Sequence, residues 1–231
     1  VTADQKSPLP KRMIKAFKVW VCLYWMVKHI LKVRVKMNWY EKLNQYFPVE
    51  EMKSKEHMEH LLKEKPELYH KDEGPHHVLM YAETNDFIFI DYLWVSAESR
   101  GQGIGHKLIE KLKAKGKPII LEVEPLDYTD SDTKKRLRFY KREGFQHASS
   151  IGYRRKSLAT NKVNPMEILY WSPNEETEES ILEKMKRTYE EIHTYKDKEF
   201  YGKSYQDADE VLTIRDGQDD NILEDINQPG P

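Results

Sequence analysis

The sequence of 231 residues contains a single cysteine, Cys22, and lacks a long uninterrupted apolar run. One cysteine excludes an intrachain disulfide and a zinc site built from several cysteines, and it favours a reducing, cytoplasmic location. The longest apolar stretch, residues 16–27, is interrupted by Lys18. It is shorter than the roughly 18 to 20 apolar residues that a membrane-spanning helix requires. We therefore expect no transmembrane span.

The chain also has no large net charge, since its 38 Lys and Arg residues nearly balance its 39 Asp and Glu residues. The balance hides an asymmetry, because residues 1–36 carry nine basic residues and one acid, which leaves a net charge of −9 on residues 37–231. A body of this charge argues against a nucleic-acid partner, which needs dense basic side chains, and mildly favours a cationic substrate.

This asymmetry suggests three parts. We interpret residues 1–36 as a basic, apolar extension that is poorly folded or not native, residues 37–195 as the folded domain, and residues 196–231 as a loosely attached acidic tail. An alternative for the first part is a basic helix lying on anionic lipid, because its tryptophan and tyrosine side chains suit that layer.

Hydrophobic periodicity predicts an α/β fold with one mixed sheet. The expected helices cover residues 39–47, 49–65, 104–116, 132–144 and 172–195, and the expected strands cover residues 76–83, 86–96, 118–125, 152–159 and 166–172. Ser172 or Asn174 is the expected cap of the last helix. His70, His76 and His77 look superficially like metal ligands, but adjacent histidines on a strand face opposite sides. We expect a solvated loop there and no metal site.

The segment RGQGIG, Arg100 to Gly105, lies between an expected strand and an expected helix. Glycines permit close approach of an anion to backbone amides, and the start of a helix attracts negative charge. The spacing differs from the dinucleotide-binding pattern G-x-G-x-x-G, because His106 stands where the third glycine belongs. It also lacks the G-K-[ST] ending of a P-loop. A plain tight turn is the alternative.

The pattern R-x-x-G-x-G resembles the pyrophosphate loop of the GNAT superfamily of N-acetyltransferases. The resemblance continues through PIILEVE, residues 118–124, and FYKREGF, residues 139–145, and covers residues 76–172. It implies the GNAT fold with splayed central strands and acetyl-CoA as co-substrate, here with a C-terminal helix and the acidic tail. From Met37 onward the chain resembles bacterial members. Two departures stand out: no strand precedes the helices after Met37, and Thr133 replaces an asparagine common in the family.

The resemblance also assigns roles to residues, each with a structural alternative such as a tight turn or ordinary core packing. It implies that backbone groups at Leu93 and Val95 pair with pantetheine, that Thr133 lies beside the cofactor, and that Tyr140 protonates the departing sulfur. The residues expected to hold the pyrophosphate are Arg100, Gly101, Gln102, Gly103, Ile104 and Gly105.

A general base must also take a proton from the amine, and a carboxylate can do so if burial raises its pKa. Glu122 is our first choice, with Glu124 and Asp91 as further candidates on neighbouring strands. The alternative is that these acids pair with the basic residues of the segment RRK, residues 154–156, or point to solvent.

The sequence therefore predicts transfer of an acetyl group from acetyl-CoA to a primary amine by direct attack, since Cys22 lies far from the motif. A non-catalytic acyl-CoA sensor or interaction module is the alternative. The acceptor, a small molecule or a protein, is left open, and so is a homodimer.

Overall fold

The computed structural model describes residues 37–127, 130–215 and 221–226. The chain divides into two units, residues 1–38 and residues 39–231, and every element described below belongs to the second. The expectations for residues 1–36 fall outside the described residues. No helix among the described residues has the length and hydrophobicity to cross a membrane.

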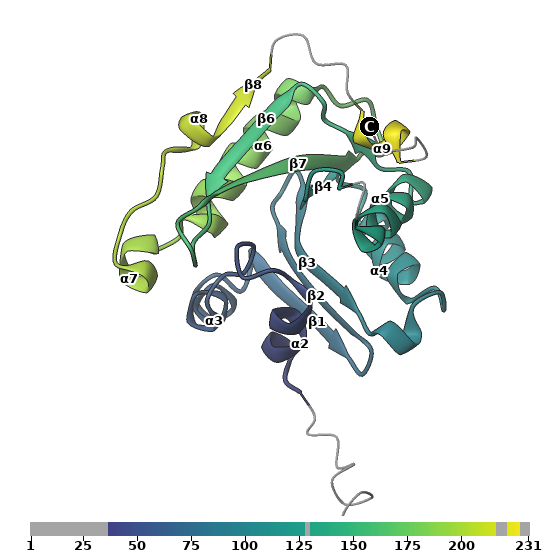
Figure 1. Cartoon of the computed structure of the whole chain (residues 1–231), viewed down its shortest axis with the longest axis horizontal. Helices are drawn as coiled ribbons and strands as arrows, with labels where there is room; N and C mark the ends of the chain where they lie inside the picture. Colours follow the sequence, from purple (N-terminus) through teal and green to yellow (C-terminus); the bar gives the residue numbers. More distant parts are fainter. Residues whose placement is uncertain (1–36, 128–129, 216–220, 227–231) are drawn as a thin grey trace, which may run out of the picture. The chain divides into compact units, whose positions relative to one another are not determined.

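Helices and strands alternate along the chain as in a mixed α/β fold (Figure 1). The helices are α2 (Trp39–Tyr46), α3 (Lys55–Glu64), η1 (Ala97–Ser99), α4 (Ile104–Lys113), α5 (Ser131–Arg142), α6 (Glu178–Thr188), η2 (Tyr189–His193), α7 (Asp197–Tyr201), α8 (Ala208–Val211) and α9 (Ile222–Asp225). The strands are β1 (Tyr69–Gly74), β2 (His77–Glu83), β3 (Ile88–Val95), β4 (Ile119–Val123), β5 (Gln146–His147), β6 (Ile151–Lys156), β7 (Val163–Trp171) and β8 (Leu212–Ile214).

The strands form a mixed sheet in the order β1-β2-β3-β4-β7-β6-β8, with β5 also pairing with β7. β3 and β4 run parallel, and the other paired strands are antiparallel. The expected mixed sheet is confirmed. Strands β2 and β3 form a hairpin. The Thr84 hydroxyl holds its turn by accepting hydrogen bonds from the amides of Asp86 and Phe87.

Each face of the sheet is covered by its own helices. On β3, Ile88 and Ile90 belong to a core with α4, α5 and α9, whereas Phe89 belongs to a core with α2, α3 and α6, as does Phe87 just before the strand. This division follows from the alternation of side chains along a strand. Figure 1 shows α4 and α5 together beside β3 and β4. A ligand bound between two separated strands of this sheet would therefore contact helices on both faces.

Three sequence expectations about elements are wrong. The segment around His70 is strand β1, because it pairs with β2 along its whole length. The second helix begins at Lys55 rather than near residue 49, since Ser54 caps it by accepting a hydrogen bond from the His57 amide. Helix α6 begins at Glu178, because Thr177 is the residue whose side chain caps it.

The described part of the tail is also more ordered than predicted. Strand β8 pairs with β6, and Val211, Leu212 and Leu223 are buried. The acidic composition of residues 196–231 led to the expectation of a loose arm, but its few aliphatic side chains are spaced so that they reach the core. Residues 216–220 and 227–231 lie outside the described residues.

Candidate active site

A slot opens in the sheet where β3 and β4 separate. The two strands pair only from Ile88 with Ile119 to Ile90 with Leu121. Beyond this point β3 stays paired with β2 as far as Val95, and β4 stays paired with β7 as far as Val123. The register between β2 and β3 shifts at the same place, where Asp91 is an extra residue. Such a bulge bends a strand, which explains the divergence.

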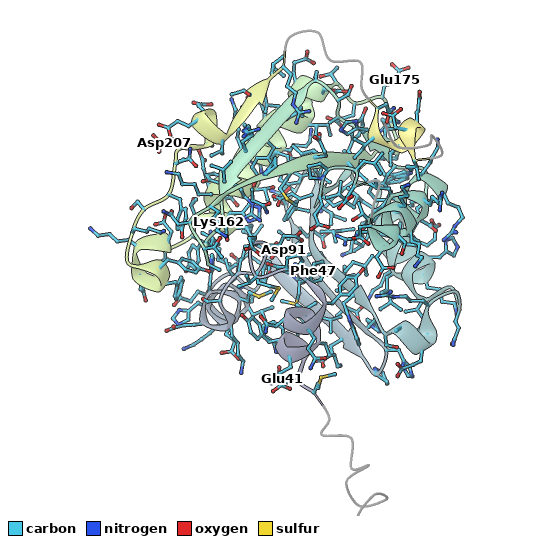
Figure 2. All side chains as sticks on the ribbon, viewed as in Figure 1. Glu41, Phe47, Asp91, Lys162, Glu175 and Asp207 are labelled. Atoms are coloured by element: carbon cyan, nitrogen blue, oxygen red, sulfur yellow. The ribbon has the colours of Figure 1, made fainter. Side chains whose placement is uncertain are left out.

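A cavity of about 750 Å³ occupies this slot. Its walls come from both faces of the sheet, since Tyr140 belongs to the core with α4 and α5, and Met166 belongs to the core with α2, α3 and α6. Asp91 and Phe47 both line it, and Figure 2 shows both in the middle of the described unit. The cavity is large enough for part of a cofactor together with a small second substrate.

The glycine segment forms one wall of the cavity. Gly101 and Gly103 have φ angles of +80° and +76°, and a Cβ atom built on either would meet no other atom within 4 Å. Gly103 caps α4, so the first amides of this helix lack partners within the helix. Open backbone and a helix start together make a site for an anionic group such as phosphate.

Basic side chains surround this wall. Arg100 stacks on the ring of Tyr46 at 5.0 Å and lies 3.8 Å from an oxygen of Asp132. Arg100, Lys135, Arg136 and Arg142 all line the cavity. A ligand carrying several phosphates suits this end of the slot, because its charge would be balanced by guanidinium and ammonium groups.

Tyr140 lies in the cavity wall on α5 and is 6% exposed. Burial raises its pKa above the ordinary value, so the phenol keeps its proton at neutral pH. Its ring packs edge-on against Phe139 and Phe145. Among the described residues the hydroxyl has no hydrogen-bond partner, which leaves it available to a ligand.

The surroundings of Glu122 lower its pKa, whereas a general base for an amine needs a raised pKa. Burial alone would raise its pKa, but His193 and Arg155 lower it on balance. The Nε2 atom of His193 lies 2.7 Å from Oε1 of Glu122, and an Arg155 nitrogen lies 3.5 Å from Oε2. A carboxylate stabilised in its ionised form is a poor proton acceptor. The expectation of a raised pKa is therefore wrong for this residue.

The other two candidate acids are also paired. Lys53 donates to Oδ1 of Asp91 at 2.6 Å, and the Tyr69 hydroxyl donates to Oδ2 at 2.5 Å. Arg136 lies 3.3 Å from an oxygen of Glu124. All three acids have a basic partner, but Asp91 and Glu124 find theirs outside the segment RRK that the sequence suggested. Only Glu122 uses a residue from the predicted basic segment.

Sequence reasoning missed Glu51, which also lines the cavity. Burial and the neighbouring Glu124 raise its pKa to about 8, against a smaller lowering by Arg136 and Arg155. The Tyr92 hydroxyl fixes its position, since it donates to the Glu51 carbonyl at 2.8 Å and accepts from the Lys53 amide at 3.0 Å. Two adjacent carboxylates that share one proton are a typical acid–base device.

A possible metal-binding group, His106, Glu110 and Glu143, lies beside the glycine segment. The His106 ring is 2.8 Å from Glu143, and Lys113 donates to Glu110 at 2.9 Å. These acids already have cationic or hydrogen-bonding partners. We interpret the contact of His106 with Glu143 as a link between α4 and the end of α5, and the contact of Lys113 with Glu110 as an ion pair within α4.

Comparisons with known proteins identify the family to which the chain belongs. A family model described as "Acetyltransferase (GNAT) domain" matches residues 68–147. The chain is 67% identical over 192 residues to the Bacillus subtilis (strain 168) protein named "Putative acetyltransferase YjbC", and the match covers 83% of this chain and all of that protein. The chain belongs to the GNAT acetyltransferase family.

Solved structures of other proteins match parts of the chain. A GNAT-family protein from Bacteroides thetaiotaomicron shares 22% identity and a TM-score of 0.49, over 71% of this chain and 90% of the other. The Streptococcus mutans UA159 protein smu.2055 shares 15% identity and a TM-score of 0.40, over 57% of this chain and 89% of the other.

Most of the site residues that the sequence predicts line the cavity. They are Leu93, Val95, Arg100, Gly101, Gly103, Ile104, Gly105, Glu122 and Tyr140. Gly105 lies inside α4, where a Cβ atom would come within 3.1 Å of the Phe139 ring. The absence of a side chain at Gly105 therefore permits close packing of α4 on α5.

Two predicted residues do not line the cavity. The Gln102 side chain points back along the loop and donates to the Glu98 carbonyl at 3.0 Å. The Thr133 hydroxyl donates to Asp130 at 2.9 Å and so supports the start of α5. The departure from the GNAT pattern at Thr133 thus coincides with a local capping role.

Proposed function

We propose that this protein transfers an acetyl group from acetyl-CoA to a primary amine by direct attack. The observation that carries the proposal is the slot between β3 and β4. It joins an anion-binding glycine wall at one end to a proton donor and a proton acceptor, Tyr140 and Glu51, farther in.

Acetyl-CoA suits the chemistry of the slot. The open backbone at Gly101 and Gly103 and the positive side chains nearby fit its phosphates. The β3 backbone beyond Ile90 has no β4 partner among the described residues, so its polar groups at Leu93 can pair with the amides of a pantetheine arm. At Val95 the carbonyl accepts a long hydrogen bond, 3.4 Å, from Nε of Arg100, which a pantetheine arm would have to share or displace. The bound cofactor supplies the acetyl group as a reactive thioester.

Two side chains of this protein handle the protons. Glu51, in its ionised form, takes a proton from the incoming ammonium group and releases it to solvent. The neutral nitrogen attacks the thioester carbonyl carbon, a C–N bond forms and the C–S bond breaks. Tyr140 gives its proton to the departing sulfur and regains one from the attacking nitrogen. The products are an amide, coenzyme A as the free thiol and one proton in solution.

The arrangement also separates the two substrates. Tyr140 and the glycine wall belong to the side of the sheet covered by α4 and α5. Glu122 points to the opposite side, where it meets His193 of η2. Donor and acceptor would therefore approach from opposite faces and meet in the slot, which fits a reaction without a covalent enzyme intermediate.

Calorimetric titration of the full-length protein with acetyl-CoA tests the cofactor site. Gly103→Trp should abolish binding, because the side chain would fill the cradle. Gly116→Trp is a matched control, since Gly116 has a similar φ of +68° and equally open surroundings but does not line the cavity. Equal binding by both variants would contradict the cradle. Binding without thiol release from any primary amine would contradict catalysis and support a sensor.

A further inference from the structure

Arg155 is an unusual component of the cavity wall. It lies on β6 beside Arg154, and because side chains alternate on a strand, Arg154 faces solvent while Arg155 faces inward. Arg155 is only 4% exposed, and it lines the cavity. Its neighbours include Tyr153, Glu122, Tyr92 and Asp91.

The hydrogen-bonding capacity of this guanidinium is largely unused. Its ion pair with Glu122 is long, at 3.5 Å, and its buried Nε atom has no hydrogen-bond partner. Among the described residues we find no hydrogen bond to any of its nitrogens. A buried guanidinium has five N–H groups to satisfy, and leaving them without partners is energetically costly. The cavity therefore has a place for an acceptor of hydrogen bonds.

The acids around Arg155 have no comparable spare capacity. Glu122 accepts from His193 at 2.7 Å, and both oxygens of Asp91 accept, one from Lys53 and one from Tyr69. The two acids and the two cations of this cluster balance in charge. A purely cationic ligand would disturb that balance and leave the guanidinium unsatisfied.

We propose that the acceptor is a small amine that also carries a carboxylate, an amino acid in chemical class, and that Arg155 binds this carboxylate. The inference rests on the proposed function and specifies its second substrate. A guanidinium binds a carboxylate through two parallel hydrogen bonds, which suits the unused N–H groups. A zwitterion also has no net charge, as the cluster requires.

The positions of Arg155 and Glu51 fit the same substrate. The charge of Arg155 acts on Glu51, so the two groups lie within electrostatic reach across one cavity. An amine at Glu51 and a carboxylate at Arg155 would then belong to one short molecule. A lysine side chain of a folded protein brings no carboxylate to this depth. The cationic acceptor that net charge favoured is thus replaced by a zwitterionic one.

Matched acceptors test the inference without any mutation. The full-length protein would be assayed with acetyl-CoA and the L-amino acids, each beside its amide, which has the same size and amine but no carboxylate. We expect at least one amino acid to exceed its amide about 10- to 100-fold in kcat/KM, as charged hydrogen bonds allow. Amides that are equal or better throughout would overturn the inference while leaving the acetyltransferase proposal intact.

Variants then assign the effect to Arg155. Arg155→Gln and Arg155→Lys should raise KM for the preferred amino acid about 10- to 100-fold, with a smaller change in kcat, because binding is lost first. Arg154→Gln is the matched control, and thermal unfolding shows whether each variant is folded. An unchanged KM in a folded Arg155→Gln protein would overturn the inference.

A binding experiment keeps the inference testable if turnover is absent. The twenty N-acetyl-L-amino acids would be screened by thermal shift with coenzyme A present, and the best would be titrated into the parent and Arg155→Gln proteins. Binding that weakens about tenfold or more in the variant supports the carboxylate site, whether or not amines are acetylated. No binding of any N-acetyl amino acid to a parent that binds coenzyme A would overturn it.

Discussion

The Nε2 atom of His193 lies 2.7 Å from Oε1 of Glu122, although 71 residues separate them in sequence. Burial lowers the pKa of His193, although Glu122 opposes this shift, and the neutral ring that burial favours donates its Nε2–H to the carboxylate. Arg155 supplies the positive charge on the other oxygen of Glu122. This contact joins the central strand β4 to η2 and to β6 on one face of the sheet.

We expect Glu122→Gln to destabilise the protein by about 3 kcal/mol or more, because it leaves Arg155 without its counter-charge. The lowered pKa of Glu122 gives stability that is present above its ordinary value of 4.5 and is lost as pH falls below it. Denaturant unfolding at several pH values would measure both effects. The exposed Glu175→Gln, labelled in Figure 2, is the control. Equal stability of the two variants would show that the contact contributes little.

Tyr140→Phe should lower kcat by about 10²- to 10⁴-fold, the usual contribution of a positioned proton donor. Acetyl-CoA binding and thermal stability should change little, because the hydroxyl has no hydrogen-bond partner among the described residues. Thiol release and calorimetry measure these quantities on the same sample. A kcat within about threefold of the parent would mean that the ring only packs.

The rate should rise with pH through about 8, since Glu51 acts as a base only after losing its proton. Glu51→Gln should remove this dependence and lower kcat/KM about 10²-fold or more. The profile would be compared with that of Glu50→Gln, using the same amine so that its own titration is identical. A pH profile unchanged by Glu51→Gln would assign the base to another group.

Leu212→Ala should cost about 2 to 5 kcal/mol of stability, because the side chain is 1% exposed on β8. Ile214→Ala on the same strand should change stability by less than about 0.5 kcal/mol, since Ile214 is 47% exposed. Denaturant midpoints of the two variants would show whether the C-terminal segment belongs to the folded unit. Similar small effects would contradict that conclusion.

Local sequence signals located much of the fold. The β-branched and aromatic residues of the segment 86–96 predict β3, and the glycine segment predicts the turn before α4, because both features depend on residues near one another in sequence. Composition misled at the tail, where many acids obscured the few apolar residues, such as Leu212, that decide burial.

The candidate site was harder to predict. The resemblance singles out Tyr140 and the glycines, which line the cavity, but the electrostatics of an acid depend on partners from distant segments. The sequence favours Glu122 but gives no sign of its contact with His193, and the helical pattern of residues 49–65 gives no reason to single out Glu51. No periodicity in the sequence indicates that Glu51 and Glu124 influence each other.

The bulge at Asp91 has a consequence for how this architecture arises. The single additional residue lies where β3 separates from β4. Deleting Asp91 would restore a regular register between β2 and β3. We then expect β3 and β4 to pair along their remaining length, which would close the slot. The smallest possible insertion thus marks the difference between a continuous sheet and one that admits a ligand through its middle.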